Sequence, residues 1–292
     1  MTTVMQLGIA AGVYKAASEI PSRLLDSVAF VTMGSFTSSF NKGNRELPVT
    51  ELYDPNTENS VNAKGLPNNG LPDFWKQEID TLVELFINKY AKLRISISPR
   101  TTGELAEMRS FLLKNERWKR IDEIEVNLAC PNHRDDDGLH PVLAHDPQAV
   151  NDRLKEWSGY PGHWAVKIAP DTPESDLFNL VNVLSAFKPN RVVSANTRLS
   201  DGELAGQKMS VPKGGLGGSV LLEAGLEQAT ILCRLLKPYG IALDACGGIT
   251  SAEAAQKYHQ CGATRGHMAT IPYFVGADAT ARIVTQFHIN QP

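Results

Sequence analysis

Eight short apolar segments alternate with amphipathic stretches along the whole chain, and this alternation limits the fold more than any other feature. We expect strands at residues 5–10, 28–33, 93–98, 123–128, 164–169, 191–196, 241–246 and 264–269. The clearest helical patterns lie between them, at residues 73–90, 103–115, 174–187 and 219–236. Eight strand–helix units predict an α/β protein with a single (β/α)8 TIM barrel. An open doubly wound sheet would show the same alternation, but the count of eight and the late glycine loops favour the barrel.

Length and charge agree with one soluble domain. A barrel of about 250 residues fits a chain of 292 residues with little left over, and no linker-like segment divides residues 1–292. The net charge of −3 and the lack of a basic run argue against nucleic-acid binding. No apolar run approaches the ~18 residues of a spanning helix, and the N-terminus lacks the features of a signal peptide. We therefore expect a cytoplasmic protein that does not bind membranes.

The cysteines point to reduced thiols. Cys130, Cys233, Cys246 and Cys261 form no CxxC pair, and a domain of this size does not need disulfide bonds. The histidines form no pair with ligand spacing, so we expect no structural metal.

Two loops are long, at residues 35–72 and 131–147, and neither shows a clear period. Both follow the carboxyl ends of predicted strands, which is the catalytic face of a barrel. Loops of more than about a dozen residues in a compact domain are usually functional. The sequence thus predicts long binding loops on the C-terminal face.

The segment VNLACPN, residues 126–132, ends a predicted strand in an unusual mixture of side chains. Asn127 and Asn132 offer neutral hydrogen-bonding groups, and Cys130 lies beside them as a group that could transfer a proton. A free cysteine is often only a small buried hydrophobic residue. Pro131 and the polar loop after it favour the functional interpretation of Cys130, whereas the other three cysteines keep the structural one.

Further polar residues follow other strands. Lys167 lies near the end of the fifth strand, where a buried lysine needs an anionic partner such as a flavin or a substrate carboxylate. A lysine reaching solvent at the rim is the alternative. Asn196 and Thr197 end the sixth strand, and Asn62 lies in NAKGLPNNG; such residues are commonly turn formers.

Glycine pairs cluster after the late strands. They occur at 214–218 (GGLGG) and 246–249 (CGGI), and residues 268–270 (MAT) end the eighth strand. Barrels commonly bind phosphate with backbone N–H groups from these loops and a helix N-terminus. Each glycine alone fits an ordinary turn, but together they predict a phosphate site.

Taken together, VNLACPN, VKIAPD, SANT, GGLGG, CGGI and NAKGLPNNGLPDF resemble the dihydroorotate dehydrogenase family, in particular its soluble class 1 with a cysteine base. The resemblance runs from about Gly8 to Thr270. It implies an FMN-binding barrel that oxidises (S)-dihydroorotate to orotate in pyrimidine biosynthesis, and a homodimer. In such an enzyme Cys130 would remove the C5 proton while hydride passes from C6 to the flavin.

The resemblance also implies residue roles. Cys130 and Lys167 would be catalytic. Substrate would be held by Asn62, Gly65, Leu66, Asn127, Asn132, Asn196 and Thr197. FMN would be lined by Ala11, Gly12, Lys15, Ser35, Ser96, Asn127, Lys167, Gly217, Gly218, Gly247, Gly248, Ala269 and Thr270.

Some residues depart from the class 1 pattern. That class usually ends its second strand in a lysine, but this chain has Met33 and Gly34. Lys15 instead stands where the membrane-associated serine class has its flavin lysine, and Lys64 replaces an apolar residue. A related enzyme acting on another cyclic amide, a flavin-binding barrel without turnover, and an aldolase using Lys167 are therefore the alternatives. The electron acceptor stays open, although no iron–sulfur pattern or N-terminal amphipathic helix is present.

Overall fold

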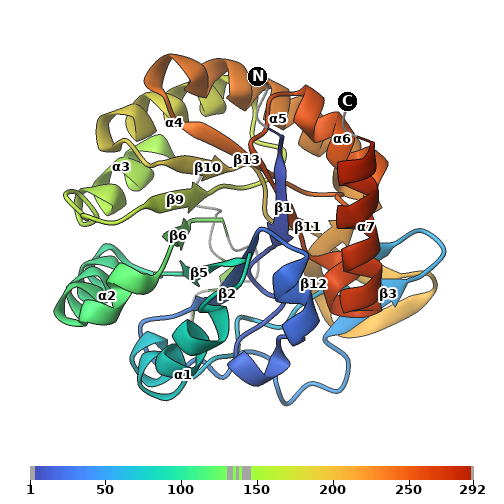
Figure 1. Ribbon diagram of the computed structural model, residues 1–292, viewed down its shortest axis with the longest axis horizontal. Helices are drawn as coiled ribbons and strands as arrows, with labels where there is room; N and C mark the ends of the chain where they lie inside the picture. The colour runs from blue at the N-terminus through green and yellow to red at the C-terminus, as the bar shows by residue number, and fades with distance from the viewer. Residues whose placement is uncertain (1–3, 130–133, 136–137, 140–145, 291–292) are drawn as a thin grey trace.

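A closed barrel of eight parallel strands forms the centre of the molecule, and helices surround it (Figure 1). The computed structural model describes residues 4–129, 134–135, 138–139 and 146–290. The order of strands around the barrel is β1-β14-β13-β10-β9-β6-β5-β2. The barrel strands are β1 (Gln6–Ile9), β2 (Phe30–Phe36), β5 (Lys92–Ile97), β6 (Glu123–Asn127), β9 (Trp164–Lys167), β10 (Arg191–Val193), β13 (Ala242–Cys246) and β14 (Arg265–Met268).

Seven α-helices are described. They are α1 (Leu71–Phe86), α2 (Thr102–Lys114), α3 (Pro147–Lys155), α4 (Glu174–Phe187), α5 (Leu222–Leu236), α6 (Ala252–Gln260) and α7 (Ala277–Ile289). Local capping explains several of their starts: the side chain of Thr101 accepts a hydrogen bond from the backbone N of Glu104, and Ser251 does the same for Ala254. Their apolar faces pack on the outer surface of the barrel, where Leu24, Leu82 and many other side chains are fully buried.

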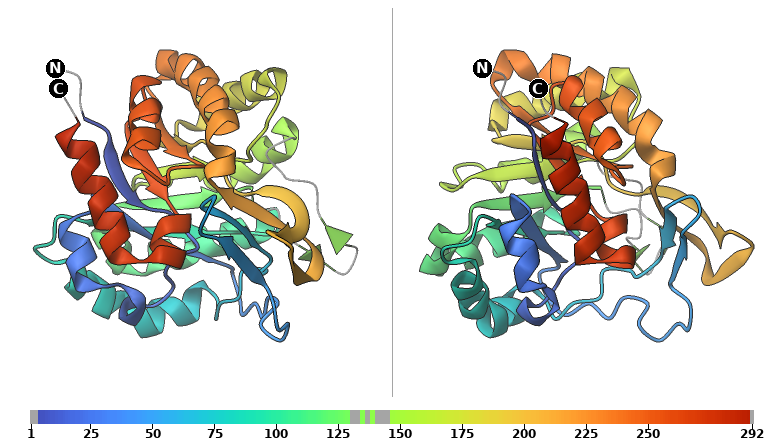
Figure 2. Two further views of the ribbon diagram at one scale, coloured as in Figure 1. Left: turned by 90° about the vertical axis from the view of Figure 1, so that its right-hand side faces the viewer. Right: turned by 45° about the vertical axis from the view of Figure 1, so that its right-hand side comes forward.

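A second, four-stranded antiparallel sheet lies beside the carboxyl ends of the barrel strands (Figure 2). Its strands are β3 (Glu51–Asp54), β4 (Asn59–Asn62), β11 (Arg198–Leu204) and β12 (Gln207–Gly218), in the order β11-β12-β4-β3. Leu52, Val61, Ala63 and Met209 form its own small core. The two-stranded sheet of β7 (Arg134–Asp135) and β8 (Gly138–Leu139) lies in the loop after β6.

The predicted barrel is confirmed, and all eight predicted strands occur within a few residues of their expected bounds. Three expectations were wrong. The segment after β1 forms two 3-10 turns, Ala17–Glu19 and Ser22–Asp26, instead of an α-helix. Residues 35–72 contain β3 and β4, and the GGLGG segment ends the long strand β12 instead of forming a loop. β4 and β12 are held as strands by pairing with each other. Neither segment has an apolar period of its own that would predict a strand.

The barrel interior contains charge in place of the branched apolar residues that usually fill it. Arg94 is fully buried and pairs with Glu123 and Asp244, which are themselves buried. His267 Nε2 lies 3.0 Å from Asp244 Oδ2. Burial lowers the pKa of His267 to about 4, so its ring is neutral at neutral pH and can donate to Asp244. These four residues, the buried ion network, come from β5, β6, β13 and β14.

Removing Arg94 should strongly destabilise the protein. In Arg94→Met the carboxylates of Glu123 and Asp244 lose their buried partner, and we expect the free energy of unfolding to fall by about 3–5 kcal/mol. Arg117→Met, which breaks the exposed pair with Asp80, should cost less than about 1 kcal/mol. Chemical denaturation of both variants measures the difference, and equal losses would contradict a structural role for the network.

Stability should depend on pH through His267. Its pKa of about 4 in the folded chain lies below the ordinary value of 6.5. Between these two pH values the unfolded chain therefore binds a proton that the folded chain does not. Unfolding free energy should therefore fall as the pH falls, by about 2 kcal/mol between pH 7 and pH 5. His267→Gln keeps a donor for Asp244 but cannot titrate, and it should lose correspondingly less over this interval. Parallel curves for parent and variant would refute the assignment.

Candidate active site

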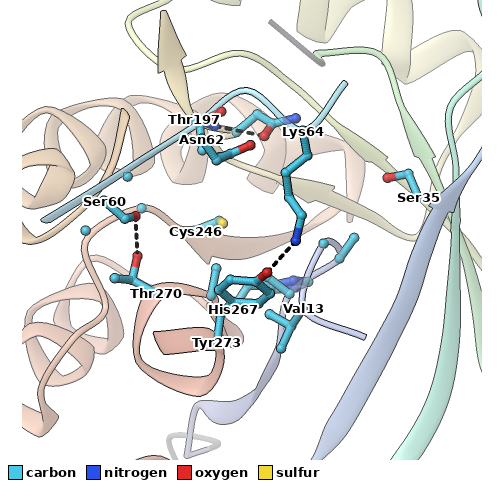
Figure 3. A pocket seen from close by; sticks show the side chains of 18 of the residues that line it. Val13, Ser35, Ser60, Asn62, Lys64, Thr197, Cys246, His267, Thr270 and Tyr273 are labelled. Carbon is cyan, nitrogen blue, oxygen red and sulfur yellow. Dashed lines mark hydrogen bonds between the residues drawn. The ribbon is translucent and has the colours of Figure 1, made fainter. Parts of the chain in front are cut away.

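A pocket of about 1200 Å³, counting space open to solvent, lies at the carboxyl ends of the barrel strands. The barrel supplies one side, including Ser35 near the end of β2 and Lys167 at the end of β9. The four-stranded sheet supplies the opposite side, with Asn62 from β4 and Gly217 from β12. Ser60 on β4 and Thr270 after β14 join the two sides through their hydroxyls, 3.3 Å apart (Figure 3).

Most of the residues predicted for a site line this one pocket. They are Ala11, Gly12, Lys15, Ser35, Asn62, Gly65, Leu66, Asn127, Lys167, Asn196, Thr197, Gly217, Gly218, Gly247, Gly248, Ala269 and Thr270. Ser96 does not line it and lies fully buried behind Ser35. Cys130 and Asn132 lie outside the described residues. The placement brings distant segments together, while the role of each residue stays a prediction.

Gly217, Gly218, Gly247 and Gly248, the glycine cradle, present backbone to the pocket. Gly218 has φ +96°, and a Cβ there would lie 2.1 Å from Glu58 O. Gly248 has φ +74°, and its Cβ would lie 2.5 Å from the backbone N of Leu222. Because Leu222 is the first residue of α5, the cradle meets a helix N-terminus, which favours an anionic ligand group.

Asn62, Asn127 and Asn196 form a carboxamide wall of the pocket. Backbone groups fix two of the carboxamides, because Ala129 N donates to Asn127 Oδ1 (3.1 Å) and Thr197 N donates to Asn196 Oδ1 (2.8 Å). Asn196 Nδ2 then donates to Asn127 Oδ1 over 3.2 Å. A wall of oriented amides can hold a planar ligand that carries both donors and acceptors.

The backbone at Gly65 and Leu66 is held from behind. Asn41 Nδ2 donates to both carbonyl oxygens, each over 2.8 Å, and Asn68 Nδ2 donates to Leu66 O over 2.7 Å. Leu66 has a positive φ of 54°. These bonds make a rigid edge beside the pocket from a segment with no regular secondary structure.

Two lysines bring positive charge to the barrel side. Lys167 is only 4% exposed, so the rim alternative for this residue was wrong. Lys15 lines the pocket and its Nζ donates to Pro67 O over 2.6 Å. No lysine side chain comes from the end of β2, since Met33 is fully buried in the outer core and position 34 is glycine.

A polar cluster that the sequence did not predict lies at the pocket edge. Lys64 extends from the end of β4 across the pocket to Tyr273 (Figure 3), and its Nζ also lies 2.6 Å from Glu51 Oε1. Burial opposes the charge of Lys64, but the hydrogen bonds to Glu51 and Tyr273 outweigh it and raise its pKa. Lys64 stood out as a departure in the sequence, whereas Glu51 and Tyr273 carried no signal.

Cys246 and His267 also line the pocket, although neither was predicted to do so. Burial raises the pKa of the Cys246 thiol, so this thiol stays protonated near neutral pH and is not available to accept a proton. Cys233, Cys246 and Cys261 are free thiols, as expected for these three. Within the described ranges, no three His, Cys, Asp or Glu side chains are arranged to hold a metal ion.

A closed parallel barrel with an anion cradle and an oriented amide wall at its C-terminal face is typical of a (β/α)8-barrel enzyme. The chain belongs to the dihydroorotate dehydrogenase family, whose model matches residues 4–289. It is thus a member of a family of flavin-dependent oxidoreductases.

Relatives and solved structures agree with this family. The chain is 28% identical over 271 residues to dihydroorotate dehydrogenase (quinone) of Haemophilus influenzae, covering 88% of this chain and 75% of the relative. It is 26% identical over 267 residues to the enzyme of the same name from Pasteurella multocida, with the same coverage. The fold is similar to the Eimeria tenella dihydroorotate dehydrogenase in complex with ferulenol, with a TM-score of 0.78 and 18% identity over 97% of this chain and 80% of that one.

The subclass stays a prediction. The sequence motifs resemble the soluble cysteine class, whereas both relatives are named as dihydroorotate dehydrogenase (quinone). Among the helices that the structure describes, none is long and apolar enough to span a bilayer.

Proposed function

We propose that this protein oxidises (S)-dihydroorotate to orotate with bound FMN. The observation that carries the proposal is the convergence of the glycine cradle, the carboxamide wall and Lys167 on a single pocket. The family match agrees with this reaction. This combination of groups suits a cyclic amide substrate and a planar cofactor that bears a phosphate.

The residues present fit FMN. The glycine cradle and the N-terminus of α5 would hold the phosphate, because backbone N–H groups there can approach an anion closely. Lys15 and Lys167 would balance negative charge on the ring system. A Cβ at Gly12 would meet no atom within 4 Å, so the pocket is open beside it. FMN, when bound, would accept the hydride from C6 of the substrate.

The substrate would lie against the carboxamide wall. Asn62, Asn127 and Asn196 would bind its ring amides, and the backbone of Gly65 and Leu66 with Thr197 would bind the remaining polar groups. Cys130 follows directly after Ala129, whose N–H is bonded to Asn127. As a thiolate, Cys130 would take the C5 proton, and loss of hydride from C6 leaves the C5–C6 double bond. Asn132 would complete the substrate contacts.

Anaerobic titration with dihydroorotate tests the reaction. We expect a yellow protein whose flavin colour bleaches on addition of dihydroorotate. Cys130→Ala should slow the bleaching by about 10²–10⁴-fold near neutral pH, since it removes the general base, while FMN stays bound. Cys233→Ala is the matched control and should behave as the parent, because Cys233 lies on α5 and does not line the pocket.

The other outcomes separate the alternatives. A yellow protein that dihydroorotate does not bleach would favour another cyclic amide or binding without turnover. A colourless protein that FMN cannot reconstitute would favour the aldolase with Lys167. Equal bleaching rates in Cys130→Ala and parent would remove Cys130 as the base.

The geometry of the glycine cradle predicts how a substitution there would change FMN affinity. In Gly248→Ala the new Cβ would meet Leu222 N and displace the start of α5, so FMN affinity should fall by about tenfold or more. Gly240→Ala is the matched control, since Gly240 has a similar φ of +68° but open space around its Cβ position. Fluorescence titration of the apoprotein measures both affinities. Equal effects would mean that backbone strain alone, and not the cradle, is responsible.

A further inference from the structure

A chain of buried hydrogen bonds runs from the pocket into the barrel interior. Asn127 Nδ2 donates to Ser35 Oγ over 3.1 Å, and the hydroxyls of Ser35 and Ser96 lie 2.8 Å apart. Ser96 Oγ donates to Glu125 Oε1 over 2.7 Å. Asn127 and Ser35 line the pocket, whereas Ser96 and Glu125 are fully buried below it. We call these four residues the Glu125 relay.

The direction of each bond follows from the number of protons available. Ser96 Oγ donates its single hydroxyl proton to Glu125 Oε1. Ser96 must then accept from Ser35, because it has no second proton. Ser35 also accepts from Asn127, whose amide orientation Ala129 N fixes independently. Ser35 is left with a lone pair, and no proton, to offer to a ligand.

Glu125 lies at the buried end of this relay. Its Oε1 accepts from Ser96, whereas its Oε2 is buried and has no hydrogen-bond partner among the described residues. Arg94 from β5, Cys246 from β13 and His267 from β14 are among the charged and titratable groups that interact with it electrostatically. None of the reaction steps above uses Glu125.

We propose that Glu125 is a positioning residue for the ligand site. Through Ser96 it fixes Ser35 as a hydrogen-bond acceptor in the pocket wall, where Figure 3 shows the Ser35 side chain. This part of the pocket therefore selects a ligand group that donates an N–H or O–H. Without Glu125, Ser96 could donate to Ser35, and the Ser35 proton would turn toward the ligand and reject that group.

Neutron crystallography of the ligand-free protein tests the bond directions directly. After deuterium exchange, we expect deuterium on Ser35 Oγ pointing to Ser96 and deuterium on Ser96 Oγ pointing to Glu125. Deuterium on Ser35 that points into the pocket would overturn the proposal. This measurement does not depend on the identity of the ligand.

A double-mutant cycle tests the consequence for binding, with FMN as the probe; this choice of ligand rests on the proposed function. Glu125→Leu and Ser96→Ala should each weaken FMN binding by about ten- to a hundredfold. Glu125→Gln keeps an acceptor oxygen and should bind FMN nearly as the parent does. In a Ser35→Ala background, Glu125→Leu should have no further effect on affinity.

Two further results would overturn two different claims. Equal losses from Glu125→Leu with and without Ser35 would show that Glu125 acts through barrel packing, and this overturns the inference. A parent protein that binds no FMN would overturn the proposed function instead, and the neutron measurement would still decide the direction of the relay.

Discussion

The pairing of Arg94 with Glu123 and Asp244 is the interaction on which the barrel depends. It ties together β5, β6 and β13 through side chains that are all at most 3% exposed. Burial raises the pKa of Glu123 despite Arg94, which shows how costly this environment is for charge. Although burial also opposes ionisation of Asp244, the hydrogen bond with His267 and the charge of Arg94 hold its pKa well below the usual range. Such a network adds little net stability over apolar packing, but it makes every partner indispensable once it is present.

The polar interior of the barrel continues toward the carboxyl ends of the strands, where it meets the pocket. Along β5 and β6, Arg94 and Glu123 lie in the ion network, Ser96 and Glu125 lie one layer above, and Asn127 reaches the pocket. His267 belongs to both the network and the pocket lining. A barrel filled with branched apolar residues could not orient polar groups at its upper end in this way. The interior therefore serves as the base of the binding site as well as the core of the fold.

The sequence predicted the barrel because eight short segments containing apolar residues alternate with amphipathic stretches along the chain. It did not predict β11 and β12, whose segments are rich in charged residues and glycine. These strands pair with each other, and β12 also pairs with β4. The same limit applies to the site. Lys167 and Asn127 could be predicted because they end apolar strands, whereas Glu51 and Tyr273 meet only after the second sheet has packed against the barrel. Cys130 and Asn132 had the clearest local motif and lie outside the described residues.

One departure from the family pattern has a structural cause. Gly34 has φ +107°, and a Cβ there would lie 2.5 Å from Ser96 O, so this position cannot carry the lysine expected at the end of the second strand. The same backbone pairs with the loop after β1, because Gly12 N donates to Gly34 O (2.6 Å) and Gly34 N donates to Tyr14 O (3.1 Å). That loop continues directly into Lys15, which lines the pocket. The close approach that excludes a side chain at position 34 thus also places Lys15, and the two changes are a single structural solution for supplying positive charge at this corner of the site.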